Sequence, residues 1–192
     1  QRSDASDFVA SMASEYGTAP LFIPCDITDV TALKSAIDQA AQAHGPITVL
    51  VNNAANDKRH ETLEVTEAFW DWSQAINLKA YFFTCQAVLA GMQKAKGGAI
   101  INFSSISYMM GNAGYPSYAT ANAGITGMTR ALAREFGPDN IRVNALMPGW
   151  VMTQKQKDLW VTDEALEGQL IEKLKEEAEK EEDNIDYEQD SQ

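Results

Sequence analysis

The sequence predicts an α/β fold, in which helices cover a parallel sheet on both faces. Short apolar segments of five or six residues alternate with longer segments whose apolar residues recur at helical spacing. Parallel strands need long crossover connections, and helices supply those connections in this class of protein. The chain has 192 residues, 45% of them hydrophobic, which suits one domain with a substantial core.

Helices are predicted where apolar residues recur every three or four positions until a glycine or proline ends the pattern. Strands are predicted at the short apolar runs between them. In chain order, we expect a helix at 4–16, a strand at 21–25, a helix at 30–44, a strand at 47–51, a helix at 66–92, a strand at 99–103, a helix at 115–136 and a strand at 141–146.

The pattern changes near residue 160, so we expect the α/β domain to cover residues 1–160. Leu166, Leu170 and Leu174 then form a narrow apolar stripe on a segment rich in Glu and Lys, which predicts an acidic amphipathic helix over 161–182. Residues 183–192 show no periodicity and are expected to be disordered.

Most of the net charge of −12 lies in the C-terminal segment, because residues 163–192 hold 13 acidic residues against three lysines. The preceding part is nearly neutral and carries no basic cluster, which disfavours nucleic-acid binding. No run of about 18 apolar residues occurs, so no membrane span is predicted.

The two cysteines, Cys25 and Cys85, are 60 residues apart and lack metal-ligand spacing, so no metal site is predicted. Both lie in apolar segments, which favours buried free thiols in a reducing compartment such as the cytoplasm; a disulfide is the alternative. The N-terminal residues lack the features of a signal peptide and an initiator Met, and we expect a fragment or a processed chain.

Small, polar or turn-forming residues follow each predicted strand. They are Asp26, the segment 52–55 (Asn-Asn-Ala-Ala), the pair Ser104 and Ser105, and the pair Pro148 and Gly149. In parallel α/β sheets, ligands bind beyond the carboxyl ends of the strands. These positions therefore predict a ligand-binding edge, although Asn52–Asn53 and Pro148–Gly149 could also be plain turns.

Tyr118 and Asn122 are four residues apart on a predicted helix and therefore project from the same face. A tyrosine that exchanges a proton near neutral pH needs help, because its reference pKa is about 10. A nearby cation is the usual help, and Asn122 is neutral.

These residues, in this order, resemble the short-chain dehydrogenase/reductase family over residues 21–153. The resemblance is carried by the segments 25–29, 50–55, 77–79, 100–105, 118–122 and 142–149. It implies a Rossmann-type doubly wound parallel sheet that binds NAD or NADP. The neighbourhoods 52–60 and 150–160 are most similar to members that oxidise sugars or polyols.

The resemblance also implies a role for each matching residue. Ser105 would hydrogen-bond the substrate oxygen, Tyr118 would be the general acid/base, Asn77 would hold a water in a proton relay, and Asn122 stands where the family has a lysine. The implied cofactor contacts are Asp26 and Ile27 at the adenine, Asn53, Ala54 and Ala55 beneath the adenosine ribose, and Pro148, Gly149, Val151 and Thr153 at the nicotinamide end.

Three departures from the family pattern lead us to expect an impaired enzyme. The opening strand, Gly-rich loop and helix are missing, and with them the phosphate contacts of the cofactor. Asn122 replaces a lysine whose charge, about 5 Å away at an effective dielectric of ~20, would contribute roughly 3 kcal/mol to ionising Tyr118. The acidic segment stands where the family has its C-terminal strand.

Three functions therefore stay open. The first is NAD(P)-linked hydride transfer to or from a sugar or other secondary alcohol. The second is a non-catalytic derivative, such as a pseudoenzyme or a subunit-interaction protein. The third is an independent acidic binding module, which rests only on the acidic C-terminal segment. The resemblance implies homo-oligomers through helices 66–92 and 115–136, and we expect Trp70, Trp72 and the Phe82–Phe83 pair in core or interface. Asp57, Arg59 and His60 could line a sugar pocket or belong to a solvated loop.

Overall fold

The computed structural model describes residues 5–153, and the described helices and strands lie in the first unit, Gln1–Gly149. A second unit begins at Trp150, and only its residues 150–153 are described. The predictions for 161–182 and 183–192 therefore lie outside the described residues.

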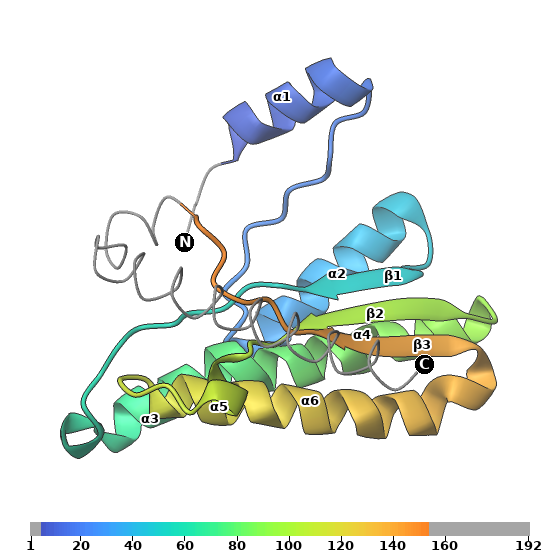
Figure 1. Ribbon diagram of the computed structural model, residues 1–192. Helices are drawn as coiled ribbons and strands as arrows, with labels where there is room; N and C mark the ends of the chain where they lie inside the picture. The colour runs from blue at the N-terminus through green and yellow to red at the C-terminus, as the bar shows by residue number, and fades with distance from the viewer. Residues whose placement is uncertain (1–4, 154–192) are drawn as a thin grey trace, which may run out of the picture. The chain divides into compact units, whose positions relative to one another are not determined.

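Three strands form one parallel sheet in the order β1-β2-β3 (Figure 1). The strands are β1 (Val49–Asn52), β2 (Gly98–Phe103) and β3 (Ile141–Leu146). Val49 pairs with Ala99, and Gly98 pairs with Ile141. Because all three strands run in one direction, the residues that follow them meet at one edge, where the sequence predicts ligand binding.

Helices account for the connections between the strands, as predicted. They are α1 (Ser6–Tyr16), α2 (Val30–His44), α3 (Glu67–Gln74), α4 (Ala80–Lys94), the single turn α5 (Ser107–Met110) and α6 (Pro116–Phe136). The side chain of Asp29 accepts hydrogen bonds from the amides of Thr31 and Ala32 and so caps the start of α2.

The helices α4 and α6 pack along one face of the sheet, and α2 packs against α4 (Figure 1). Exposure alternates along the strands accordingly: Val49 is 61% exposed and Val51 52%, whereas Asn52 is buried. The parallel α/β class is confirmed. The expected cover on both faces is not seen in the described part, where residues of one sheet face remain exposed.

The predicted strand at 21–25 is wrong. The structure has no strand between α1 and α2, and Leu21 and Phe22 are about half exposed. A strand requires a neighbour for its backbone N–H and C=O groups. Within residues 5–153 no strand pairs with this segment, so its apolar sequence alone does not make it one.

The predicted helix over 66–92 is continuous but changes its winding. Five residues between α3 and α4, Ala75–Lys79, form a π-helical segment with Asn77 at its centre. Such segments are rare and occur frequently at functional sites. The helical prediction for 66–92 is confirmed, but apolar spacing gave no sign of this segment.

The core lies between the sheet and the helices, and its fully buried members include Cys85, Met92, Ile100 and Ile141. Cys85 is a free thiol, and burial raises its pKa to about 11. Cys25 is also free but only half-buried, so the predicted free thiols are confirmed and full burial of Cys25 is not. Of the described helices, none is long and apolar enough to cross a membrane.

A buried polar network joins the carboxyl ends of β1 and β2 to the helices. Asn52 Nδ2 donates to Asn102 Oδ1 at 2.9 Å, and Asn102 Nδ2 donates to Thr129 Oγ1 on α6 at 3.0 Å. Thr84 Oγ1 on α4 donates to Asn52 Oδ1 at 2.7 Å. Each bond satisfies a group that would be costly to bury unpaired, so the network fixes both helices under the sheet edge.

Removing one member of this network should destabilise the fold. Thr129→Val preserves the side-chain shape but removes the acceptor of Asn102, and should lower the free energy of unfolding by about 1–3 kcal/mol. Thr120→Val is the matched control, because Thr120 is exposed on the same helix and bonds only the Pro116 carbonyl; it should cost about 0.5 kcal/mol or less. Urea unfolding measures both variants, and equal losses would contradict the assignment.

Candidate active site

Two neighbouring elements bring Ser105 and Tyr118 together at the predicted edge. Ser105 follows β2, and Tyr118 lies in the first turn of α6, where Pro116 occupies the first helical position. The hydroxyl of Ser104 donates to the Asn122 carbonyl at 2.9 Å, which fastens the end of β2 to α6. The Ser105 side chain lies close enough to Tyr118 to lower the pKa of its phenol, and its oxygen also accepts a hydrogen bond from the amide of Ser107 at 3.2 Å.

The environment of Tyr118 holds its phenol in the neutral form. Burial raises its pKa above 10, hydrogen bonds from the Asn122 and Ser105 side chains lower it in part, and the charge of Asp57 raises it again. No cation of the described part is among the groups that act on it. Tyr118 is therefore held in the neutral form near neutral pH, and the proton-transfer role implied by the resemblance stays a prediction.

Asn122 is 2% exposed, and its amide is directed to the helix itself. Nδ2 donates to the Tyr118 carbonyl at 2.9 Å, four residues earlier. The Asn122 carbonyl accepts bonds from the hydroxyls of Ser104 and Thr126. The residue thus fixes the first turns of α6 but brings no charge to Tyr118.

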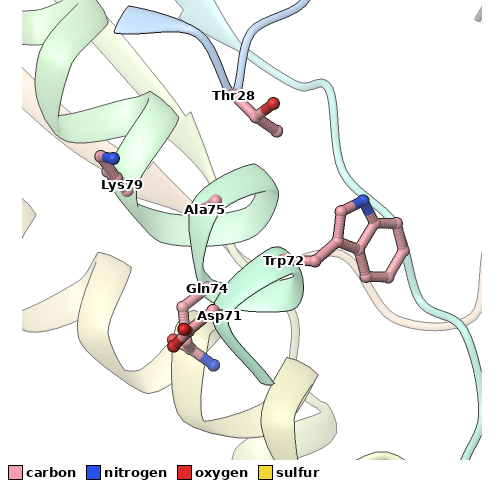
Figure 2. A pocket seen from close by; sticks show the side chains of 6 residues that line it. All are labelled: Thr28, Asp71, Trp72, Gln74, Ala75 and Lys79. Carbon is pink, nitrogen blue, oxygen red and sulfur yellow. The ribbon is translucent and has the colours of Figure 1, made fainter. Parts of the chain in front are cut away.

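Lys79, the lysine next to Asn77 in the sequence motif, does not supply the missing charge. It lines a hollow of about 520 Å³ whose other lining residues are Thr28, Asp71, Trp72, Gln74 and Ala75 (Figure 2). Lys79 is not among the groups that shift the pKa of Tyr118.

Asn77 is 1% exposed, and its side chain holds the loop that leaves β1. Oδ1 accepts the amide of Asn56 at 2.8 Å, and Nδ2 donates to the Asn56 carbonyl at 3.0 Å. The remaining N–H of Nδ2 points to the hydroxyl of Ser73 at 3.4 Å. The side chain is fully used by these bonds, and the proton-relay role implied by the resemblance stays a prediction.

The predicted cofactor residues Asn53, Ala54, Ala55, Pro148 and Gly149 lie at the same edge. Asn53, Ala54 and Ala55 are exposed, between buried Asn52 and the anchored Asn56. Pro148 accepts a hydrogen bond from the amide of Ile106 at 3.4 Å, which places it and the exposed Gly149 beside Ser105. Small, exposed groups of this kind leave room for a flat ligand.

Asp26 and Ile27 lie in the turn before α2. The carboxylate of Asp26 accepts bonds from both the amide and the hydroxyl of Thr28, at 2.9 and 2.8 Å, so it stabilises the turn. Val151 and Thr153 belong to the second unit, where the Thr153 amide donates to the Val151 carbonyl at 2.8 Å. Their predicted role at the nicotinamide end stays a prediction.

The loop 56–61 contains residues that the sequence left open between a sugar pocket and a solvated loop. Arg59 stacks on the ring of Tyr115 at 3.8 Å, and the Tyr115 ring packs edge-on against Tyr118 at 5.8 Å. Asp57 is half-buried and acts on Tyr118, as described above. The loop therefore flanks Tyr118, and Arg59 on it is exposed to solvent, so the sugar-pocket role stays a prediction.

Ser73, Gln74 and Ser117 also belong to this region, and sequence reasoning missed them. Gln74 Nε2 donates to the Ser117 carbonyl at 2.8 Å, and the Ser73 hydroxyl donates to the Ser117 hydroxyl at 3.1 Å. These contacts join α3 to the residue before Tyr118. Serine and glutamine on predicted helices carry no distinctive spacing, so no signal could have found them.

The sequence of this chain is similar to the sequences of known dehydrogenases. The family model for short chain dehydrogenases matches residues 1–164. A probable galactose dehydrogenase of Rhizobium meliloti (strain 1021) is 48% identical over 155 residues, which are 81% of this chain and 60% of that protein. A D-xylose 1-dehydrogenase of Caulobacter vibrioides is 47% identical over 152 residues, 79% of this chain and 59% of that protein.

Solved structures show the same fold. The crystal structure of a candidate short-chain alcohol dehydrogenase from Sinorhizobium meliloti 1021 superposes with a TM-score of 0.78 at 34% identity, covering 88% of this chain and 66% of that one. The Rossmann-type α/β class is thereby confirmed, with three strands in the described part. The chain spans about 60% of the length of the curated relatives above. It belongs to the short-chain dehydrogenase family.

Proposed function

We propose that this chain carries the substrate half of an NAD(P)-dependent oxidoreductase that acts on a sugar or another secondary alcohol. The pairing of Ser105 with Tyr118 at the carboxyl edge of the sheet supports this proposal most directly. Within this edge, the exposed segment 53–55 and the pair Pro148 and Gly149 fit the ribose and nicotinamide of the cofactor. The names of the sugar dehydrogenases above support the substrate class.

The chemistry follows from these two residues. A bound nicotinamide would accept the hydride from the alcohol carbon. The alcohol proton must leave at the same time, and the phenolic oxygen of Tyr118 would take it. The Ser105 hydroxyl, which lies close enough to Tyr118 to lower its pKa, would donate a hydrogen bond to the substrate oxygen and stabilise its developing charge.

We infer that this chain performs the reaction poorly. Taking the alcohol proton requires an ionised tyrosine, and burial without a cation raises the pKa of Tyr118 above its ordinary value. In addition, the 192 residues contain no Gly-rich phosphate motif, so little would bind the pyrophosphate of the cofactor.

A non-catalytic interaction protein is the second candidate, and the neutral Asn122 beside Tyr118 favours it. Trp70, Trp72 and Phe82 are each about 40% exposed on α3 and α4, so they do not belong to the core of this chain. Exposed aromatic side chains are typical of interface anchors. We propose that these helices, with α6, carry homo-oligomer contacts. We also propose a location in the cytoplasm, which the free cysteines support.

Calorimetric titration with NAD and with NADP tests the cofactor half of the proposal. We expect no measurable heat of binding, because the sequence has no Gly-rich motif to bind the pyrophosphate of the cofactor. The dissociation constant should then be weaker than about 1 mM, which corresponds to less than roughly 4 kcal/mol of binding free energy. Supplying a Gly-rich strand–loop–helix unit as an N-terminal fusion should produce binding. Clear binding by the chain alone would show that the phosphate motif is dispensable.

Restoring the cation tests the electrostatic half. Asn122→Lys should make ionisation of Tyr118 roughly a hundredfold easier, since a charge about 5 Å away contributes roughly 3 kcal/mol. Ala123→Lys is the matched control, because it adds the same charge at the neighbouring exposed position. The pKa of the Tyr118 phenol is measured in both variants from the pH dependence of its ¹³Cζ resonance. The resonance is assigned by its absence in Tyr118→Phe.

Turnover should not appear in Asn122→Lys alone, because the cofactor still lacks its phosphate contacts. It should rise strongly when the fusion and the substitution are combined. Measurable sugar oxidation by the single substitution would contradict this order of defects.

A further inference from the structure

Every polar group of Ser117, the residue before Tyr118, has a partner from another part of the chain. Its amide donates to His60 Nε2 at 3.4 Å, and its hydroxyl contacts the same nitrogen at 3.2 Å. Its hydroxyl also accepts from Ser73, and its carbonyl accepts from Gln74. Ser117 is 1% exposed, so its position is fixed by buried bonds rather than by water.

These bonds belong to a series of hydrogen bonds in which each side chain donates to the next one. Nδ2 of Asn77 can only donate, and it donates to the hydroxyl of Ser73. The hydroxyl of Ser73 donates to the hydroxyl of Ser117. The Ser117 hydroxyl can then donate its own proton to Nε2 of His60. Successive bonds of one direction polarise and strengthen one another.

The partners of His60 fix its tautomer. The carbonyl of Lys58 lies 3.1 Å from Nδ1 and can only accept, so Nδ1 carries the proton. The amide of Ser117 can only donate, so Nε2 carries none. The neutral tautomer that fits both partners has its proton on Nδ1, and its ring ends the series as an acceptor from Ser117 and a donor to Lys58.

We propose that His60 is a positioning residue, which through Nε2 fixes the first turn of α6 and closes the loop 56–60 against it. The loop is held at its other end by Asn77, which binds both backbone groups of Asn56. The amide of His60 adds a bond to the Gly114 carbonyl at 2.8 Å. His60 thus joins the loop to α6 one residue before Tyr118.

This arrangement has a consequence for substrate selection, and that part of the inference rests on the proposed function. Asp57 and Arg59 lie on the loop between its two anchors and flank Tyr118 and Tyr115. A loop held at both ends presents such side chains in one geometry, as discrimination between hydroxyl patterns of a sugar requires. His60 would then determine the positions of the Asp57 and Arg59 side chains without contacting the substrate itself.

The tautomer can be measured on the unaltered chain. The sequence has two histidines, and His44 at the exposed end of α2 serves as the internal control. Two-bond ¹⁵N–¹H spectra in alkaline buffer, where free imidazole is neutral, should show His60 protonated at Nδ1. A proton on Nε2 of His60 would overturn the proposal, because Nε2 could then accept no bond from the Ser117 amide.

Two substitutions separate the acceptor from the ring. His60→Phe preserves packing on Phe69, which lies 4.8 Å from the imidazole ring, but removes the nitrogen. His60→Gln removes the ring but offers a side-chain oxygen as acceptor. Amide exchange at Ser117 should be about tenfold faster in His60→Phe, roughly the factor that one hydrogen bond contributes, and near the original rate in His60→Gln.

The Tyr118 ¹³Cζ titration supplies the second measurement. A frayed first turn admits water to Tyr118, so His60→Phe should lower its pKa toward the ordinary value, while His60→Gln and the control His44→Gln should not. If exchange and titration are the same in His60→Phe as in the unaltered chain, His60 does not position Tyr118. Neither measurement requires cofactor or turnover, so a combined fusion and Asn122→Lys protein that failed to oxidise sugars would count against the proposed function and not against this inference.

Discussion

The side-chain amide of Asn77 holds together the three parts of the chain from which the site is built. It binds both backbone groups of Asn56 and the hydroxyl of Ser73, and Ser73 in turn bonds Ser117 on α6. Asn77 is almost fully buried in a π-helical segment, so losing any of these bonds would leave an unpaired group inside the protein. These bonds hold three elements in one arrangement: the loop after β1, the helix α3 and the start of α6. This arrangement fixes the position of Tyr118.

This arrangement holds Tyr118 beside Ser105. It brings no cation of the described part to the phenol, so the pKa of Tyr118 is not lowered toward neutrality. Neutral hydrogen bonds contribute about 0.5–1.5 kcal/mol each, whereas a cation about 5 Å away contributes roughly 3 kcal/mol at an effective dielectric of ~20. The bonds from Ser105 and Asn122 lower the pKa of Tyr118, but burial outweighs them. An asparagine carboxamide thus preserves the helix and the contact with Tyr118 but cannot replace a charge.

The sequence indicated the regular part of this structure well, because helices and paired strands follow from local spacing. Predicted and observed bounds agree closely for α2, α6 and β3, and Ser105 and Tyr118 meet as the resemblance implied. The segment 21–25 failed because a strand also needs a neighbour, which its own residues cannot reveal. The bonds of His60 to Ser117 span 57 residues, and the π-helical segment depends on packing; neither leaves a pattern in the spacing of apolar residues.

We propose that Tyr118 is placed for proton transfer but stays un-ionised near neutral pH. The pH titration of its ¹³Cζ resonance in the unaltered chain tests this directly, with Tyr118→Phe identifying the signal. We predict a midpoint above 10, because burial raises the pKa and the described part of the chain offers no cation to lower it. A midpoint near neutrality would contradict the account, since it would show that Tyr118 is activated without a lysine at position 122.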